Sequence, residues 1–132
     1  MADKLIIDWK QYNLIVEKLA VQIYKSGFKP DMLIGIMRGG APIIDVLSRV
    51  FKLKCAYLAV ESYSGEGTED QQGELVFSRE MSSTVHEMKG NLLLCDDLSD
   101  TGVTLNKSID WLKKYPPLKD NIIDIKTAVL WK

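Results

Sequence analysis

Apolar residues in this chain follow two spacings, one typical of amphipathic helices and one typical of buried strands. Between residues 12 and 24 apolar side chains recur every three or four positions, which predicts a helix. Asp8 stands where an N-cap residue is expected, and Gly27 followed by Pro30 predicts the end of the helix. Two more helical faces are Ile43, Val46, Leu47, Val50 and Phe51, which follow Pro42, and Leu105, Ile109 and Leu112, which follow Thr101.

Mostly apolar runs separate these helices, and we expect each run to be a strand. The runs cover residues 32–37, 55–60, 91–95 and 122–130, and the continuous run at 32–37 predicts a strand buried on both faces. Shorter runs at 4–7 and 75–77 predict an edge strand and a returning strand. Apolar strands that alternate with helices are typical of a parallel sheet. The sequence therefore predicts one α/β domain over residues 1–132, with a central, mostly parallel sheet and helices on both faces.

Ligands of such sheets bind outside the carboxyl ends of the strands, so the residues that follow each predicted strand are the candidates for function. These are Arg38-Gly39-Gly40, Glu61-Ser62-Tyr63, and the stretch from Asp96 to Thr104. Residues 61–74 are polar and contain three glycines, which predicts a long mobile loop.

Composition narrows the class of protein without naming a function. The 132 residues are 46% hydrophobic and 27% charged, with a net charge of −1, so nothing favours nucleic acid or an anionic membrane as a partner. No apolar run approaches the roughly 20 residues that span a bilayer. Cys55 and Cys95 form neither a disulfide framework nor a metal-site spacing, and His86, the only histidine, stands in a polar stretch where we expect it at the surface. We expect a cytoplasmic protein.

Residues 96–104 carry the most specific chemistry. A buried strand delivers Asp96 and Asp97, and after Asp100 the residues Thr101-Gly102-Val103-Thr104 open a helix. The free backbone N–H groups and the dipole at that opening favour a phosphate group. Carboxylates beside a phosphate are explained by a sugar diol, which donates hydrogen bonds to them, or by Mg²⁺, which binds carboxylate and phosphate oxygens together. A phosphorylated sugar with free hydroxyls and a magnesium-bound pyrophosphate satisfies both conditions.

The stretch CDDLSDTGVT, residues 95–104, resembles the signature with which type I phosphoribosyltransferases bind phosphoribosyl pyrophosphate (PRPP). Met37-Arg38-Gly39-Gly40 resembles the pyrophosphate loop of that family, and Glu61-Ser62-Tyr63 resembles the start of its flexible catalytic loop. The first 24 residues and the last strand are similar to bacterial xanthine-guanine phosphoribosyltransferases. Lys132 falls on the position of the lysine that reads the 6-oxygen of the purine. The hood, a segment that follows this strand in such enzymes, is expected to be missing.

The resemblance implies a role for each of these residues in the Mg²⁺-dependent transfer of ribose 5-phosphate from PRPP to a 6-oxopurine, a reaction of purine salvage. Asp96 and Asp97 would hold the ribose hydroxyls, directly or through Mg²⁺, and Asp100 would face the purine as general base or hydrogen-bond acceptor. The 5-phosphate would lie on Asp100, Thr101, Gly102, Val103 and Thr104, and the pyrophosphate on Arg38, Gly39 and Gly40. Ser62 and Tyr63 would exclude water, and Lys132 would bind the purine. The resemblance also implies a homodimer or homotetramer.

Other interpretations remain open at this point. The same type of enzyme could act on a pyrimidine, or a protein of this fold could bind PRPP or a nucleotide as a regulator. Asp96-Asp97 after an apolar strand also resembles a Walker B sequence, but the chain has no Walker A phosphate loop, and a calcium loop would need a different ligand spacing. Arg79 fits either a contact with pyrophosphate or a solvated surface, and Trp9 and Tyr12 fit packing or a subunit interface better than contact with a base.

Overall fold

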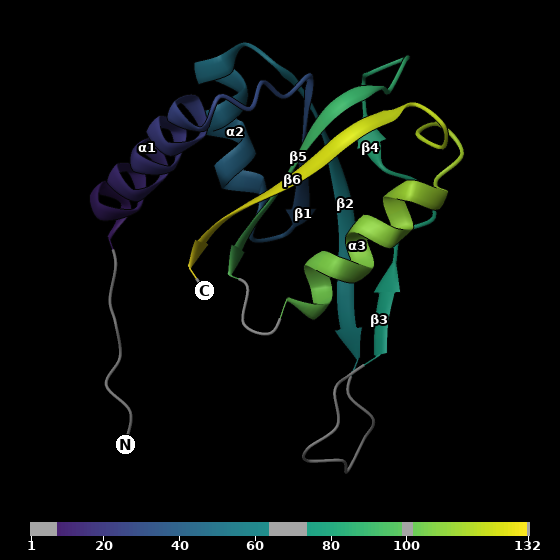
Figure 1. Cartoon of the computed structure of the whole chain (residues 1–132). Coiled ribbons are helices and arrows are strands. Elements are labelled where there is room, and N and C mark those ends of the chain that lie inside the picture. The colour runs from purple at the N-terminus through teal and green to yellow at the C-terminus, as the bar shows by residue number, and fades with distance from the viewer. Residues whose placement is uncertain (1–7, 64–73, 99–101, 132) are drawn as a thin grey trace.

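A computed structural model describes residues 8–63, 74–98 and 102–131 of the chain, and these residues form three helices and six strands (Figure 1). The strand expected at residues 4–7 lies outside the described residues. In chain order the elements are α1 (Trp9–Ser26), β1 (Met32–Met37), α2 (Ala41–Phe51), β2 (Lys54–Tyr63), β3 (Glu74–Phe77), β4 (Ser82–Ser83), β5 (Gly90–Leu98), α3 (Val103–Lys114) and β6 (Ile122–Trp131).

The strands form one mixed, mostly parallel sheet, as the alternation of strands and helices predicted. Its order is β3-β2-β1-β5-β6, and β4 pairs with β2 off this path. β1 runs parallel to both β2 and β5, and β5 runs parallel to β6. Only β3 and β4 run antiparallel to their neighbour β2. The carboxyl ends of β1, β2, β5 and β6 consequently meet at one edge of the sheet.

Helices cover both faces of the sheet, which confirms the predicted layers. α1 and α2 lie on one face and α3 lies on the other (Figure 1). Successive side chains of β5 serve the two layers in turn: Leu92 and Leu94 belong to the core that includes Leu105 and Leu112 of α3. Leu93 and Cys95 belong to the core formed with α1 and α2. This alternation decides which layer each later residue of β5 faces.

Local signals in the sequence place the first helix accurately. The Asp8 carboxylate accepts a hydrogen bond from the Gln11 backbone N–H (2.8 Å), and the Gln11 side chain accepts one from the Asp8 N–H (3.1 Å). This reciprocal capping box stabilises the amino end of α1. Gly27 ends the helix with φ = 80°, a conformation that glycine adopts without the steric cost of a side chain.

Two strands extend beyond their predicted ends. β2 continues through Tyr63 and β5 continues through Leu98, so Glu61-Ser62-Tyr63 and Asp96-Asp97 lie within strands and not after them. The predicted loop at 61–74 is therefore wrong for its first three residues, and also for Glu74, which begins β3; residues 64–73 lie outside the described residues. Hydrogen bonding to a neighbouring strand outweighed the polar character of these residues, because β3 pairs with β2 and β6 pairs with β5.

The single histidine lies at the surface, as expected. His86 is exposed, and both cysteines are free, Cys95 being buried and Cys55 half-buried. Within residues 8–63, 74–98 and 102–131, no helix is long and apolar enough to cross a membrane.

Candidate functional site

Asp96 and Asp97 lie near the carboxyl end of β5, and their side chains face opposite layers. The alternation of β5 directs Asp96 toward the α3 layer and Asp97 toward the α1 and α2 layer. Asp96 is buried, at 9% exposure, and pairs in register with Val129 of β6. Its Oδ1 atom accepts a hydrogen bond of 2.8 Å from the backbone N–H of Asp97. The two carboxylates thus border the sheet edge from both sides.

Burial raises the pKa of Asp96 to about 6, and the negative charge of Asp97 adds to this effect. The hydrogen bond from the Asp97 N–H acts in the opposite direction, because it stabilises the ionised form. A buried carboxylate beside a second carboxylate is costly unless a cation or a hydrogen-bond donor comes close. The electrostatics therefore favour a ligand that brings hydroxyl groups or a metal ion to this pair.

The loop after β1 packs against this acidic pair. A side-chain carbon at residue 39 would overlap the Asp97 carboxylate, so Gly39 and Asp97 are in direct contact. Gly40 is packed against the Cys95 carbonyl oxygen and the backbone of Ile36, and its N–H donates to the Ile36 oxygen (2.7 Å). The Met37–Arg38 peptide bond is cis, and the side chain of Arg38 is exposed. Glycine at 39 and 40 is what lets the loop reach β5.

The amino end of α3 is the third part of the site. Gly102 is the N-cap residue, with φ = 79°, and its carbonyl accepts a hydrogen bond of 2.9 Å from Asn106 N–H. A glycine cap brings no side chain of its own to the helix opening, so the positive end of the helix dipole is not shielded by this residue. Val103 and Thr104 form the first turn, in half-buried positions. Asp100 and Thr101, predicted to complete this turn, lie outside the described residues.

The remaining predicted residues are located only in part. Ser62 and Tyr63 are the last residues of β2, in register with Leu75 and Glu74 of β3. The structure describes their backbone but not their side chains. Lys132 lies outside the described residues. The structure therefore brings together Arg38–Gly40, Asp96–Asp97 and Gly102–Thr104 at the carboxyl edge of the sheet, and it leaves Ser62, Tyr63 and Lys132 as predictions.

Two cavities open at this edge. One of about 350 Å³ lies between the amino end of α1 and the loop after β1, and Tyr12, Gly39, Pro42 and Asp97 line it. Burial raises the pKa of Tyr12, and the charge of Asp97 raises it further, so this phenol stays protonated beside the carboxylate. The other cavity, of about 740 Å³, lies between the same loop and the β2–β3 hairpin, with Arg38 and Ser78 in its lining.

Reasoning from the sequence had assigned Tyr12 to packing or to a subunit interface and had said nothing of Pro42 or Ser78 as parts of a site. Nothing in the sequence near them indicates the strand ends that they face. A subunit interface at Tyr12 stays a prediction. The structure places Tyr12 in the lining of the cavity beside Asp97.

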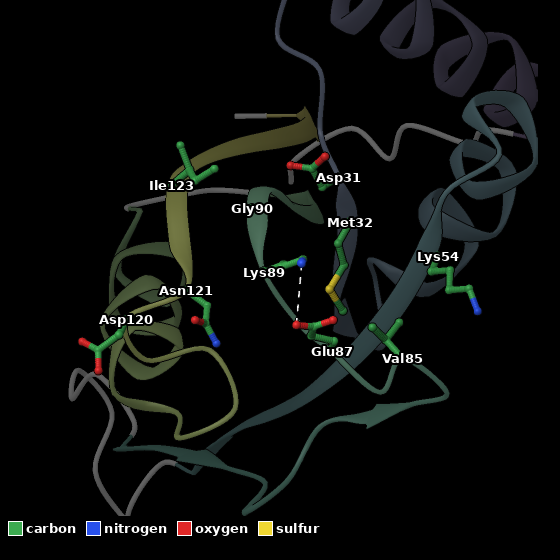
Figure 2. Close-up of a pocket in the computed structure, with 10 residues that line it drawn as sticks. All are labelled: Asp31, Met32, Lys54, Val85, Glu87, Lys89, Gly90, Asp120, Asn121 and Ile123. Atoms are coloured by element: carbon green, nitrogen blue, oxygen red, sulfur yellow. Dashed lines mark ion pairs between the residues drawn. The ribbon is translucent and has the colours of Figure 1, made fainter.

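A further cavity, of about 570 Å³, lies at the opposite edge of the sheet, where β1, β2, β5 and β6 begin (Figure 2). Its walls carry charges of both signs, including Lys54, Asp31 and the exposed pair Lys89–Glu87 with a nitrogen–oxygen distance of 3.6 Å. None of the predicted site residues lines it. Three of those residues, Arg38, Gly39 and Asp97, instead line the two cavities at the carboxyl edge.

The donor set at the carboxyl edge fits a magnesium ion that is shared with a bound phosphate compound. Among the described residues, no group of three or more His, Cys, Asp or Glu side chains could hold a metal alone. Mg²⁺ commonly binds through one or two carboxylates and completes its shell with water and substrate phosphates. Asp96 and Asp97 suit that role, while the loop at Gly39 and a helix opening suit a polyphosphate.

Known protein families and solved structures include proteins that are similar to this chain. The family described as the phosphoribosyl transferase domain matches residues 5–132. A purine phosphoribosyltransferase from Pyrococcus horikoshii Ot3 has a similar structure, with 26% sequence identity and a TM-score of 0.73, over 97% of this chain and 77% of that one. A xanthine-guanine-hypoxanthine phosphoribosyltransferase from Helicobacter pylori is similar at 18% identity and a TM-score of 0.64, over 91% and 84% of the two chains.

A third similar structure is a protein from Neisseria gonorrhoeae solved with bound ppGpp, at 20% identity and a TM-score of 0.72, over 98% of this chain and 71% of that one. The second and third structures share the fold. Because the family match extends over almost all of the 132 residues and the site lies at the sheet edge that the motifs predicted, this chain belongs to the phosphoribosyltransferase family.

Proposed function

We propose that this protein transfers ribose 5-phosphate from PRPP to a 6-oxopurine, with Mg²⁺, and releases pyrophosphate. The contact between Gly39 and Asp97 is the observation that carries the proposal. Because the loop of Arg38, Gly39 and Gly40 lies against the carboxylate pair, one ligand that holds both a pyrophosphate and a diol could bind the loop and the pair at once. The similarity to the Pyrococcus horikoshii purine enzyme supports a purine as the acceptor.

Each part of PRPP has a proposed set of contacts. Asp96 and Asp97 hold the ribose hydroxyls, directly or through Mg²⁺, which these two carboxylates would bind. Arg38 and the N–H group of Gly39 hold the pyrophosphate, while Gly40, whose N–H donates to the Ile36 oxygen, shapes the loop. The turn formed by Asp100, Thr101, Gly102, Val103 and Thr104 holds the 5-phosphate. Thr104 and the helix opening supply donors that match a dianion.

The chemistry then depends on position and charge. The bond between ribose C1 and pyrophosphate breaks and leaves a ribose with oxocarbenium character, which the purine nitrogen attacks. Mg²⁺ supplies charge neutralisation for the departing pyrophosphate. Asp100 accepts the proton or a hydrogen bond from the purine near N7, and Lys132 donates to its 6-oxygen. Ser62 and Tyr63 exclude water, which would otherwise hydrolyse PRPP.

The test is a panel of bases. Protein, Mg²⁺ and PRPP are mixed with hypoxanthine, guanine, xanthine, orotate or uracil, and nucleotide formation is followed by ultraviolet absorbance. We expect product with at least one 6-oxopurine, none after chelation of Mg²⁺, and none from Asp97→Asn, whose fold should persist. Product formed only with a pyrimidine would show that the acceptor base is a pyrimidine and not a purine. Turnover unchanged by Asp97→Asn would refute the assignment of the site.

A second candidate is a regulator that binds PRPP or a nucleotide without turning it over. The structural similarity to the Neisseria gonorrhoeae protein with bound ppGpp favours this candidate. Calorimetry separates the two: micromolar binding of PRPP or a guanine nucleotide, together with no product from any base, would support the regulator. Light scattering in the same samples would test the expected homodimer or homotetramer.

A further inference from the structure

Ser78 lies one residue beyond β3, in the wall of the cavity that it shares with Arg38. Its backbone N–H donates a hydrogen bond of 2.9 Å to the carbonyl oxygen of Ala59, which continues the β2–β3 ladder by one pair. Ala59 in turn is in register with Met37 of β1, the residue before Arg38. Ser78 and the loop after β1 are thus separated by two strand spacings, about 10 Å between backbones.

The side chain of Ser78 points to the face of the sheet on which that loop lies. The preceding pair of the ladder is Val60 with Phe77, and both side chains pack against the core under α3. Side chains alternate along a strand, so the pair formed by Ala59 and Ser78 faces the opposite layer. The loop at 38–40 leads into α2 on that layer and contacts Asp97 there.

The hydroxyl group of Ser78 is buried, and among the described residues it has no hydrogen-bond partner. Leaving a buried hydroxyl without a partner costs free energy, so native proteins keep few such groups. Rotation about χ1 moves the oxygen between three staggered positions and can direct it to a neighbour that enters the cavity. The cavity wall beside it is apolar at Ala59 and Val76 and carries charges of both signs, from Arg38 and Glu61. A magnesium-bound anion with oxygen acceptors, such as pyrophosphate, fits this mixed wall, because Arg38 can face its oxygens.

We propose that Ser78 donates a hydrogen bond to the terminal phosphate of the pyrophosphate group, opposite the loop formed by Arg38, Gly39 and Gly40. This proposal rests on the proposed function, because it takes the loop as the holder of pyrophosphate. Ser78 would thereby be a binding residue contributed by the position just after β3, the strand that pairs with the end of β2. It would bind the departing pyrophosphate on the side opposite the loop at residues 38–40.

The test uses Ser78→Ala and inorganic pyrophosphate with Mg²⁺ as the probe. Calorimetry should show pyrophosphate bound about tenfold more weakly than by the wild type, because a hydrogen bond to a charged group is lost. The thermal midpoint should stay equal or rise, because the substitution removes a buried hydroxyl without a partner. Ser82→Ala, at an exposed position of β4, is the matched control and should change neither quantity.

Unchanged pyrophosphate affinity in Ser78→Ala would overturn the proposal, and so would a fall in the thermal midpoint of several degrees, since that result would give the hydroxyl a structural partner. Pyrophosphate binding is measured without turnover, so it is independent of the base panel. A chain that makes no nucleotide but loses pyrophosphate affinity in Ser78→Ala refutes the enzyme and retains the contact. An active enzyme whose product inhibition by pyrophosphate is unchanged in Ser78→Ala retains the enzyme and refutes the contact.

Discussion

Gly39 touches the carboxylate of Asp97, although the two residues belong to different strand ends and are far apart in the sequence. The contact leaves no room for a side-chain carbon at residue 39. It holds the loop after β1 against the end of β5, where Asp96 and Asp97 border the sheet edge. Any substitution that changes the shape of residue 39 therefore acts first on a proposed ligand of ribose and magnesium.

Gly39→Ala should weaken PRPP binding far more than it weakens the fold. The added methyl group overlaps the Asp97 carboxylate, which is the end of a side chain and can rotate away, so most of the damage falls on the site. We expect at least a tenfold rise in the apparent dissociation constant for Mg²⁺–PRPP by calorimetry, with a thermal midpoint within a few degrees of the wild type.

Gly40→Ala is the contrasting control for that prediction. A side-chain carbon at residue 40 meets the Cys95 carbonyl and the backbone of Ile36, neither of which can rotate away. This variant should lower the thermal midpoint clearly or fail to fold. Suppose Gly39→Ala lowered the thermal midpoint as much as Gly40→Ala does. The inference that residue 39 affects mainly ligand binding and residue 40 mainly the fold would then be wrong.

Much of this fold could be predicted from local signals. The N-cap Asp8, the glycine after α1, the apolar run at 32–37 and the β-branched residues of 122–130 mark elements whose limits depend on nearby residues. The phosphoribosyltransferase motif at 95–104 was sufficient to indicate the family, because its acids, glycine and threonines lie close together in the chain.

Relationships that depend on pairing across the sheet could not be predicted. The sequence predicts that the polar residues at the ends of β2 and β5 follow their strands, because it does not show that β3 and β6 extend the ladders past them. The opposite facing of Asp96 and Asp97 follows only once both are known to lie in a strand. The contact of Gly39 with Asp97 and the cavity between Arg38 and Ser78 require the strand order β2-β1-β5, which no local pattern encodes.

The raised pKa of Asp96 predicts how stability depends on pH in the absence of metal. Its ordinary pKa of 3.8 becomes about 6 in the folded protein, so the folded state binds this proton more tightly than the unfolded state. Stability should therefore fall as pH rises from about 4 to above 6, where the buried group becomes ionised. Asp96→Asn removes this fall and should stabilise the protein at pH 7.5 by up to about 3 kcal/mol.

Urea unfolding of the wild type and of Asp96→Asn, at pH 4 and at pH 7.5, measures this effect. The difference between the two proteins should be small at the lower pH and large at the higher pH. Asp110→Asn, at an exposed position of α3, controls for the loss of a negative charge and should leave the pH dependence unchanged. Parallel curves for wild type and Asp96→Asn would contradict the shifted pKa.

Thr104→Ala should weaken the binding of the 5-phosphate. Thr104 lies in the first turn of α3, where backbone N–H groups have no intrahelical partner and a phosphate can accept from them and from the hydroxyl. Losing one hydrogen bond to a charged group costs about 1.5–3 kcal/mol, so the apparent constant for PRPP should rise about tenfold or more. Steady-state kinetics check this against Thr84→Ala, an exposed position. A rise in the constant for the base alone would show that Thr104 contacts a different part of the reactants.

Tyr115→Phe should destabilise the fold by about 1–3 kcal/mol, because one hydroxyl group ties the end of α3 to the segment after β3. The Tyr115 hydroxyl donates to Glu80 (2.6 Å) and accepts from the buried backbone N–H of Met81 (3.3 Å). Burial and the contact with Glu80 raise the pKa of Tyr115, so the phenol remains protonated and able to donate at neutral pH.

Without that oxygen the Met81 N–H loses its acceptor, while the ring keeps its stacking on Trp111 at 4.6 Å. Chemical unfolding followed by Trp fluorescence measures the change, because Trp111 lies against the altered ring. Tyr24→Phe is the matched control: its side chain is 79% exposed, so removing its hydroxyl should change stability by less than about 0.5 kcal/mol. Equal free energies of unfolding for the two variants would mean that solvent replaces the Tyr115 hydroxyl at Met81, and that this hydroxyl does not stabilise the contact between α3 and the segment after β3.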